Sequence, residues 1–127
     1  MIASDPLIAR ERSRAMTVND ILPLIDGRMV CGDGEREING VYVGDLLSRA
    51  MSHVSADSLW VTIMSNVNVV AVATLTEPAA IVLAESVALQ SDALEGAKDN
   101  GITVISTPLS AYEICVKLHE GEKGTGE

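Results

Sequence analysis

Residues 58–86 read SLWVTIMSNVNVVAVATLTEPAAIVLAES, and this stretch decides the fold. It contains two short apolar runs rich in β-branched residues, Leu59–Ile63 and Ala80–Leu83, with a helical segment between them. A third such run, Ile102–Ser106, comes later, and each of the three is followed by a polar break and a helix. This order predicts an α/β fold: a three-layer unit whose mainly parallel central sheet is flanked by helices.

The composition is that of an acidic chain with few aromatic residues. The 127 residues carry a formal net charge of −9 and include no Phe, one Trp and two Tyr. Such a chain is poorly suited to bind nucleic acid or an anionic membrane, so neither is expected as a partner. No apolar run has transmembrane length and no signal-peptide core is present, so we expect a cytoplasmic protein. Cys31 and Cys115 are then expected to be reduced thiols, with a disulfide or redox pair as the less favoured alternative.

The sequence predicts one folded domain between two irregular ends. Residues 1–16 are charged and irregular and are expected to form a mobile amino-terminal extension, which could order on binding a partner. Residues 17–120 are expected to form the single α/β domain. Residues 121–127 are polar and rich in glycine, so a disordered tail is expected there.

Shorter elements are predicted before the three strand-helix units. A first helix is expected to begin at Thr17 and to end early at Pro23. Short strands are expected at Arg28–Cys31 and Val41–Val43, and Asp45 is expected to cap the next helix through its side chain.

The helix that begins near Asn68 differs from the others because it has no charged face. No Lys or Arg occurs between Asp57 and Ala97, and the helix itself reads VVAVATL over residues 69–75. Such a helix is expected to be covered on nearly all sides. A second copy of the chain could supply that cover, which predicts a homodimer; alternatively the sheet, the amino-terminal part and the last helix suffice.

Polar side chains gather in the breaks that follow the three strands. Parallel sheets bind ligands at the carboxyl ends of their strands, so these side chains are the candidate ligand-binding residues for a small metabolite or anion. They are Thr62, Ser65, Asn66, Asn68, Glu85, Ser86, Thr107 and Ser110. Ser and Asn are also common caps and turn residues, so a purely structural role is the alternative.

Nothing in the sequence predicts catalysis, a metal or a cofactor. There is no phosphate-binding loop and no dinucleotide fingerprint, and His53 and His119 lack neighbouring ligands at a suitable spacing. Glu85 would act as a catalytic carboxylate only with a hydroxyl within hydrogen-bond reach and a displaced pKa. We therefore expect a protein that is not an enzyme and that needs no cofactor.

The chain resembles the DRTGG domain family, and through it the amino-terminal domain of bacterial HPr kinase/phosphorylase. The resemblance runs from about Thr17 to Leu118 and depends on an ordered series of segments. These are Thr17–Ile21, Val41–Leu47, Asp57–Thr62, Asn68–Ala73, Pro78–Val82 and Asn100–Ser110. The string Asp-Arg-Thr-Gly-Gly itself occurs nowhere in the chain.

This resemblance implies a compact α/β unit that accompanies regulatory modules or kinase domains. The kinase's phosphate loop lies in its other domain, which has no counterpart here, so no kinase activity is implied. The expected function is a non-catalytic regulatory domain that senses a small ligand or transmits a signal. The alternative is an interaction subunit that docks on a larger enzyme complex without a ligand of its own.

Overall fold

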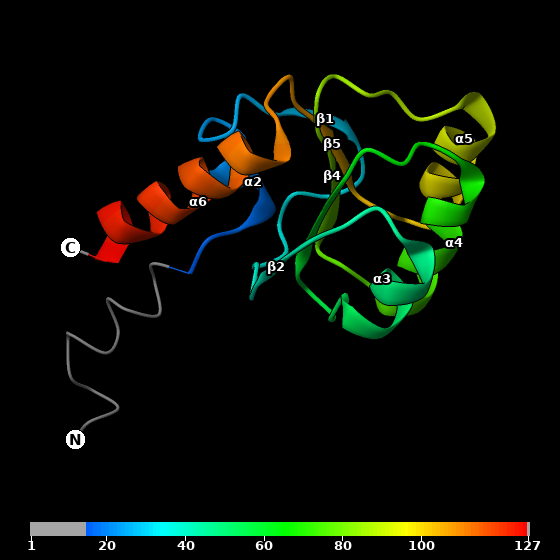
Figure 1. Ribbon diagram of the computed structural model, residues 1–127, viewed down its shortest axis with the longest axis horizontal. Coiled ribbons are helices and arrows are strands. Elements are labelled where there is room, and N and C mark those ends of the chain that lie inside the picture. Colours follow the sequence, from blue (N-terminus) through cyan, green and yellow to red (C-terminus); the bar gives the residue numbers. More distant parts are fainter. Residues whose placement is uncertain (1–14, 127) are drawn as a thin grey trace.

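The structure is a computed structural model and describes residues 15–126. Its centre is a five-stranded sheet with the strand order β1-β5-β4-β3-β2 (Figure 1). The strands are β1 (Arg28–Cys31), β2 (Val41–Val43), β3 (Leu59–Thr62), β4 (Ala80–Leu83) and β5 (Val104–Ser106). Strands β2, β3, β4 and β5 are parallel, and β1 joins β5 in the antiparallel direction. The predicted α/β fold with a mainly parallel sheet is confirmed.

Helices cover both faces of this sheet. Three of them, α3, α4 and α5, lie together on one face, and α2 and α6 pack against the other (Figure 1). Their bounds are α2 (Val18–Ile21), α3 (Leu47–His53), α4 (Val67–Thr76), α5 (Ser91–Asp99) and α6 (Ala111–Gly126). Within residues 15–126, no helix is both long and apolar enough to cross a lipid bilayer.

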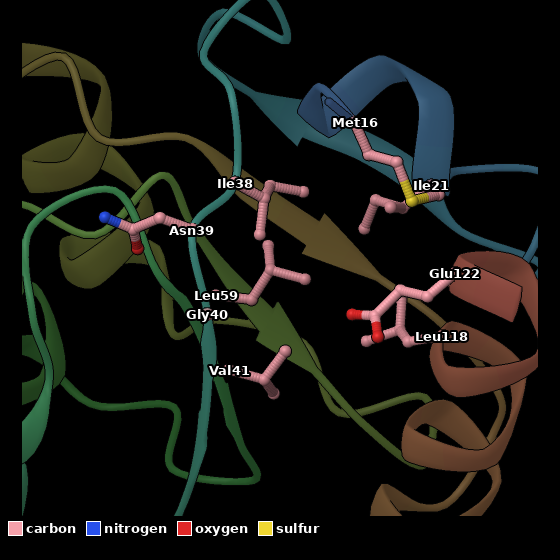
Figure 2. A pocket seen from close by; sticks show the side chains of 9 residues that line it. All are labelled: Met16, Ile21, Ile38, Asn39, Gly40, Val41, Leu59, Leu118 and Glu122. Atoms are coloured by element: carbon pink, nitrogen blue, oxygen red, sulfur yellow. The ribbon is translucent and has the colours of Figure 1, made fainter. Parts of the chain in front are cut away.

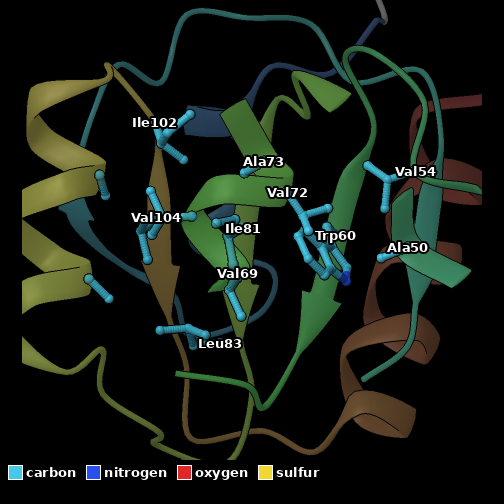
Figure 3. Close-up of a cluster of buried hydrophobic side chains, with 13 residues drawn as sticks. Ala50, Val54, Trp60, Val69, Val72, Ala73, Ile81, Leu83, Ile102 and Val104 are labelled. Atoms are coloured by element: carbon cyan, nitrogen blue, oxygen red, sulfur yellow. The ribbon is translucent and has the colours of Figure 1, made fainter. Parts of the chain in front are cut away.

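Strand side chains alternate between two apolar clusters, as the two-residue period of a strand requires. In β4, Ile81 and Leu83 face α3–α5, while Val82 faces α2 and α6. Trp60 of β3 has no exposed surface and lies in the cluster beneath α3 and α4 (Figure 3). The all-apolar strands predicted from sequence are therefore buried on both faces, as is usual for parallel sheets.

Because β1 runs antiparallel to the other four strands, it begins at the edge of the sheet where they end. Its first residue, Arg28, pairs with Ser106, the last residue of β5. Arg28 therefore lies at the edge where the parallel strands end, which we call the carboxyl edge. The opposite edge, where those strands begin, is called the amino edge.

One helix start differs from the sequence-based expectation. Asp45 does not cap α3: the N-cap is Leu46, which makes no side-chain capping bond. By contrast, Thr17 caps α2 in a reciprocal capping box with Asp20, as expected from the sequence.

The prediction that α4 is covered on nearly all sides is wrong for a single chain. The helix is enclosed by the sheet, α3 and α5, and its buried residues are Val69, Val70, Val72 and Ala73. An uncharged stripe remains outside, with Val67 46% and Leu75 69% exposed. The last helix, α6, lies on the other face of the sheet and contributes nothing to this cover.

The structure describes part of each of the two ends that were predicted to be irregular. Residues 1–14 and 127 lie outside the described residues. Met16 belongs to the fold, since its carbonyl accepts a hydrogen bond from the Ile38 N–H at 2.8 Å and its side chain packs against the α2–α6 cluster. At the other end α6 continues to Gly126, where a disordered tail was expected. Gly121 lies so close to Leu24 that a Cβ added to the glycine would be 2.7 Å from Leu24 Cδ1. This contact extends the packed face of α6.

Candidate functional site

The carboxyl edge brings the predicted polar breaks together. Thr62 is in register with Leu83, and Leu83 is in register with Ser106, so β3, β4 and β5 end side by side. The loops that follow are joined to each other through the main chain. The Glu85 N–H donates to Leu109 O at 2.8 Å and the Ser86 N–H donates to Thr107 O at 2.9 Å. The edge is therefore one connected surface.

Thr62 and Asp45 connect two of these loops. The Thr62 hydroxyl donates to the Asp45 carboxylate at 2.7 Å, and the Ile63 N–H donates to the same oxygen at 2.9 Å. This explains why Asp45 does not cap α3: its side chain binds the end of β3 instead. Because Thr62 is 2% exposed, its hydroxyl is held inside the fold.

The break before α4 contains Ser65, Asn66 and Asn68. Asn66 is the N-cap, and its side-chain oxygen accepts a hydrogen bond from the Asn68 N–H at 3.0 Å. The Ser65 carbonyl accepts from the Gln90 N–H at 2.9 Å, which ties this break to the start of α5. Among the described residues, the side chains of Ser65 and Asn68 have no hydrogen-bond partner within the chain.

Glu85 and Ser86 follow the central strand β4 in a rare backbone conformation. Both are left-handed, with φ of 57° and 60°. A non-glycine residue in this region is strained, and two in succession persist only where the surroundings fix them. Here the main-chain bonds to Leu109 and Thr107 hold them, so both exposed side chains are available at the surface.

Thr107 and Ser110 have structural partners. The Thr107 hydroxyl donates to Ile25 O at 2.5 Å and accepts from the Leu109 N–H at 3.1 Å. Ser110 forms a capping box with Glu113: the Glu113 N–H donates to the Ser110 hydroxyl at 3.1 Å, and the Ser110 N–H donates to the Glu113 carboxylate at 2.9 Å. These bonds fix the loop that enters α6.

The eight predicted site residues thus divide into two groups. Four are engaged by the fold through their side chains: Thr62, Asn66, Thr107 and Ser110. The other four present polar groups without a partner inside the described chain: Ser65, Asn68, Glu85 and Ser86. A ligand role for any of them stays a prediction, and the second group carries it best.

Sequence reasoning missed a cation at this edge. Arg28 lines a pocket of about 110 Å³ that we call the Arg28 pocket. Its other lining residues are Val30, Leu83, Val87, Ala88, Leu89, Leu94 and Ser106. No local pattern marks Arg28, because it lies far from these loops in the sequence and is brought there by the antiparallel pairing of β1 with β5.

Two larger hollows lie at the amino edge. An apolar groove of about 240 Å³ opens between α6 and the segment entering β2, and Figure 2 shows Leu118 facing Leu59 and Val41 across it. A second hollow of about 240 Å³ is lined by Arg36, Glu77 and Asn100. None of the predicted site residues lines either of them.

Metal-ligand clusters and thiol reactivity can be assessed for the described residues. Within residues 15–126, no group of three or more His, Cys, Asp or Glu side chains is placed to hold a metal ion. Burial raises the pKa of the Cys31 and Cys115 thiols, which keeps both protonated and weakly nucleophilic at neutral pH. Cys31 Sγ donates to Ile102 O at 3.4 Å, a structural contact.

Comparison with known proteins gives a family and a solved neighbour. The DRTGG domain model matches residues 20–120. No curated protein matches the chain. A similar solved structure is the CBS and DRTGG domains of the regulatory region of Clostridium perfringens pyrophosphatase, complexed with its activator, diadenosine tetraphosphate. The two share 15% sequence identity with a TM-score of 0.69 over 86% of this chain and 48% of that one, so this chain spans about half of its neighbour. With the family model covering most of its length, the chain belongs to the DRTGG domain family.

Proposed function

We propose that this DRTGG domain is a non-catalytic regulatory module that binds a small ligand at the carboxyl edge of its sheet. The regulatory class expected from the sequence is supported by the matched family and by the neighbour, which is itself a regulatory region. The proposed ligand-binding residues are the eight named above. Ser65, Asn68, Glu85 and Ser86 would contact the ligand, and Thr62, Asn66, Thr107 and Ser110 would hold the loops.

One observation carries this proposal: Glu85 and Ser86 are held in consecutive left-handed conformations at the end of the central strand. Strain of this kind is retained where it positions side chains for a task. The main-chain bonds to Thr107 and Leu109 keep the loop rigid, so little ordering would be needed on binding. A preorganised polar edge is what a sensor of small molecules requires.

The charged groups at the carboxyl edge favour a ligand with few negative charges. The pyrophosphatase neighbour binds diadenosine tetraphosphate, a highly charged nucleotide. In this chain two negatively charged side chains, Glu85 and Asp45, lie at the carboxyl edge, and the positively charged Arg28 lines the pocket there. A polyphosphate would meet repulsion as well as attraction, so a metabolite with fewer charges fits better.

The first test is a thermal-shift screen of the purified protein against nucleotides, small acids and common metabolites. A ligand for the folded state raises the melting temperature with dose. That shift should be lost in Asn68→Ala and Glu85→Gln. It should persist in the control Asn39→Ala, which changes an exposed residue at the amino edge. A stable protein that responds to no compound would contradict the proposal.

A second candidate function is an interaction module without its own ligand, and the exposed stripe of α4 favours it. Val67, Ala71 and Leu75 are exposed, uncharged and spaced four residues apart, so they share one side of the helix. A second copy of the chain or a larger enzyme complex could cover them. We propose a homodimer through this stripe, since two such stripes are alike and can pair about a two-fold axis.

Light scattering tests the dimer. The wild-type chain should have twice the mass of one chain, and Leu75→Lys should reduce it to the mass of one. Tyr112→Lys is a matched control because Tyr112 is 78% exposed on α6, on the other face of the sheet. A monomeric wild-type protein, or a Leu75→Lys variant with unchanged mass, would contradict pairing through α4.

A cytoplasmic location is part of the proposal. Both described cysteines are free thiols, and they lie on different sides of the sheet, Cys31 in the α3–α5 cluster and Cys115 on α6. Two separate thiols that form no disulfide suit a reducing compartment. The closer similarity to the amino-terminal domain of HPr kinase/phosphorylase is likewise proposed, on the ordered segments described above.

A further inference from the structure

The Arg28 pocket combines a cation with apolar walls. Val30, Leu83 and Leu94 form its interior, and Arg28 and Ser106 supply its charged and polar groups. Val30 and Leu83 also pack against the α3–α5 cluster, so these walls belong to the core and are fixed in place. The pocket therefore offers a firm apolar surface with one charged group at the edge.

The sheet register places Arg28 and Ser106 together. They are paired residues of β1 and β5, and Ser106 is in turn in register with Leu83 of β4. The register of β1 shifts between Met29 and Cys31, and Val30, at this irregularity, lines the same pocket as Arg28. The guanidinium, the hydroxyl and the side chains of Val30 and Leu83 thus come from three neighbouring strands, and Leu94 of α5 completes the apolar wall.

Arg28 has no ion-pair partner among the described residues, although the chain carries a net charge of −9. Arg36 shows the contrast, because its guanidinium donates to the Asp57 carboxylate and to the Pro78 and Glu77 carbonyls. A guanidinium presents parallel N–H donors that match a carboxylate in a bidentate arrangement. What Arg28 lacks inside the chain is an anion.

The pocket's size and walls decide which anion fits. At about 110 Å³ it is smaller than the roughly 300–1,000 Å³ of typical drug-sized sites, so it takes only a few carbon atoms. A phosphate dianion would place charge against Leu83 and Leu94, which cannot solvate it. A monoanion with a short apolar chain satisfies both parts of the pocket.

We propose that the Arg28 pocket binds a small aliphatic carboxylate. Its carboxylate would accept hydrogen bonds from the Arg28 guanidinium and the Ser106 hydroxyl, while its hydrocarbon chain would lie against Leu83 and Leu94. This inference goes beyond the proposed function: the Arg28 pocket lies at the same edge of the sheet, but none of the eight proposed ligand-binding residues lines it.

Isothermal titration with isovalerate tests the proposal, with isovaleramide as an uncharged analogue of the same shape and inorganic phosphate as a second anion. Isovalerate should bind, and the amide and phosphate should not. Arg28→Gln should weaken isovalerate binding roughly ten- to hundredfold, since it removes a charge-assisted pair of hydrogen bonds. Arg49→Gln, which removes the same charge from an exposed position on α3, should leave binding unchanged.

A second variant fills the pocket and leaves Arg28 in place. Ala88 is an exposed lining residue, so Ala88→Leu should abolish isovalerate binding with a melting temperature close to that of the wild type. Equal binding of the amide, tighter binding of phosphate, or wild-type affinity in Arg28→Gln would overturn the proposal. If isovalerate fails but another compound binds and depends on Asn68, the pocket proposal fails and the proposed function stands. If no compound binds at all, both fail.

Discussion

Main-chain hydrogen bonds hold left-handed residues at both edges of the sheet, such as the Asp57 N–H to Glu77 O at 3.0 Å, but only the amino edge adds an arginine side chain to them. At the amino edge, Asp57 and Glu77 are left-handed, with φ of 65° and 56°, and Arg36 bonds to both residues. At the carboxyl edge, Glu85 and Ser86 are also left-handed, but main-chain bonds to neighbouring loops hold them. At the amino edge the charged side chains of Arg36 and Asp57 help to close the fold, whereas at the carboxyl edge Asp45 does so and Glu85 stays exposed and available for a ligand.

The largest expected effect tests whether the buried hydroxyls at the carboxyl edge are structural. Thr107 is 1% exposed, and Thr107→Val keeps its shape but leaves Ile25 O and the Leu109 N–H without their partner. We expect the free energy of unfolding to fall by about 2 kcal/mol in urea denaturation. Thr107→Ser keeps the hydroxyl and should lose about half as much or less. If Thr107→Val is as stable as the wild type, the fold does not depend on the Thr107 hydroxyl.

A smaller loss is expected when the amino-edge clamp is removed. Arg36→Met deletes the bonds to Asp57, Glu77 and Pro78, but Arg36 and Asp57 are 43% and 47% exposed in their side chains, so water replaces much of what is lost. The expected destabilisation is about 1 kcal/mol, and it should shrink at high salt because the ion pair is screened. A loss that does not depend on salt would mean that the carbonyl contacts, and not the charge, hold this edge.

A gain in stability is expected from relieving strain at the carboxyl edge. Glycine adopts a positive φ without steric cost, so Glu85→Gly should raise the free energy of unfolding by about 0.5 kcal/mol. Glu85→Ala removes the same carboxylate but keeps the Cβ, and should give no gain. Equal stability of the two variants would show that the strain at Glu85 is negligible. Loss of ligand binding in Glu85→Gly, alongside the gain, would show that stability is given up for function here.

The smallest expected effect concerns Arg28. Because it has no ion-pair partner among residues 15–126, Arg28→Gln should change the free energy of unfolding by less than about 0.5 kcal/mol. The change in the free energy of unfolding can be compared directly with that of Arg36→Met in the same denaturation series, because both substitutions remove one guanidinium. A loss in Arg28→Gln as large as in Arg36→Met would show that Arg28 also serves the fold.

The sheet could be predicted from sequence because its signals are local. Leu59–Val61 and Ala80–Leu83 are apolar throughout, which is the pattern of strands buried on both faces. The polar breaks after them were sufficient to place the candidate site at the carboxyl edge, because parallel strands end together.

The features that were missed depend on contacts between distant residues. Asp45 has the sequence context of a helix cap, but it binds Thr62, which only the parallel pairing of β2 and β3 brings near. Arg28 reaches the edge through β1, whose direction the local sequence does not indicate. The cover of α4 comes from α3 and α5 lying on either side of it, an arrangement that no helical period encodes.

The pairing of β1 with β5 has a consequence for how the chain folds during synthesis. Among the strands of residues 15–126, β1 is the first to be synthesised and its sheet partner β5 is the last. Until Val104–Ser106 has emerged, β1 has no strand to join and the β4 edge stays open, so the sheet closes only late in translation. Contacts between sequence-distant strands form slowly, so the Arg28 pocket, whose walls include both β1 and β5, assembles late among the features of residues 15–126.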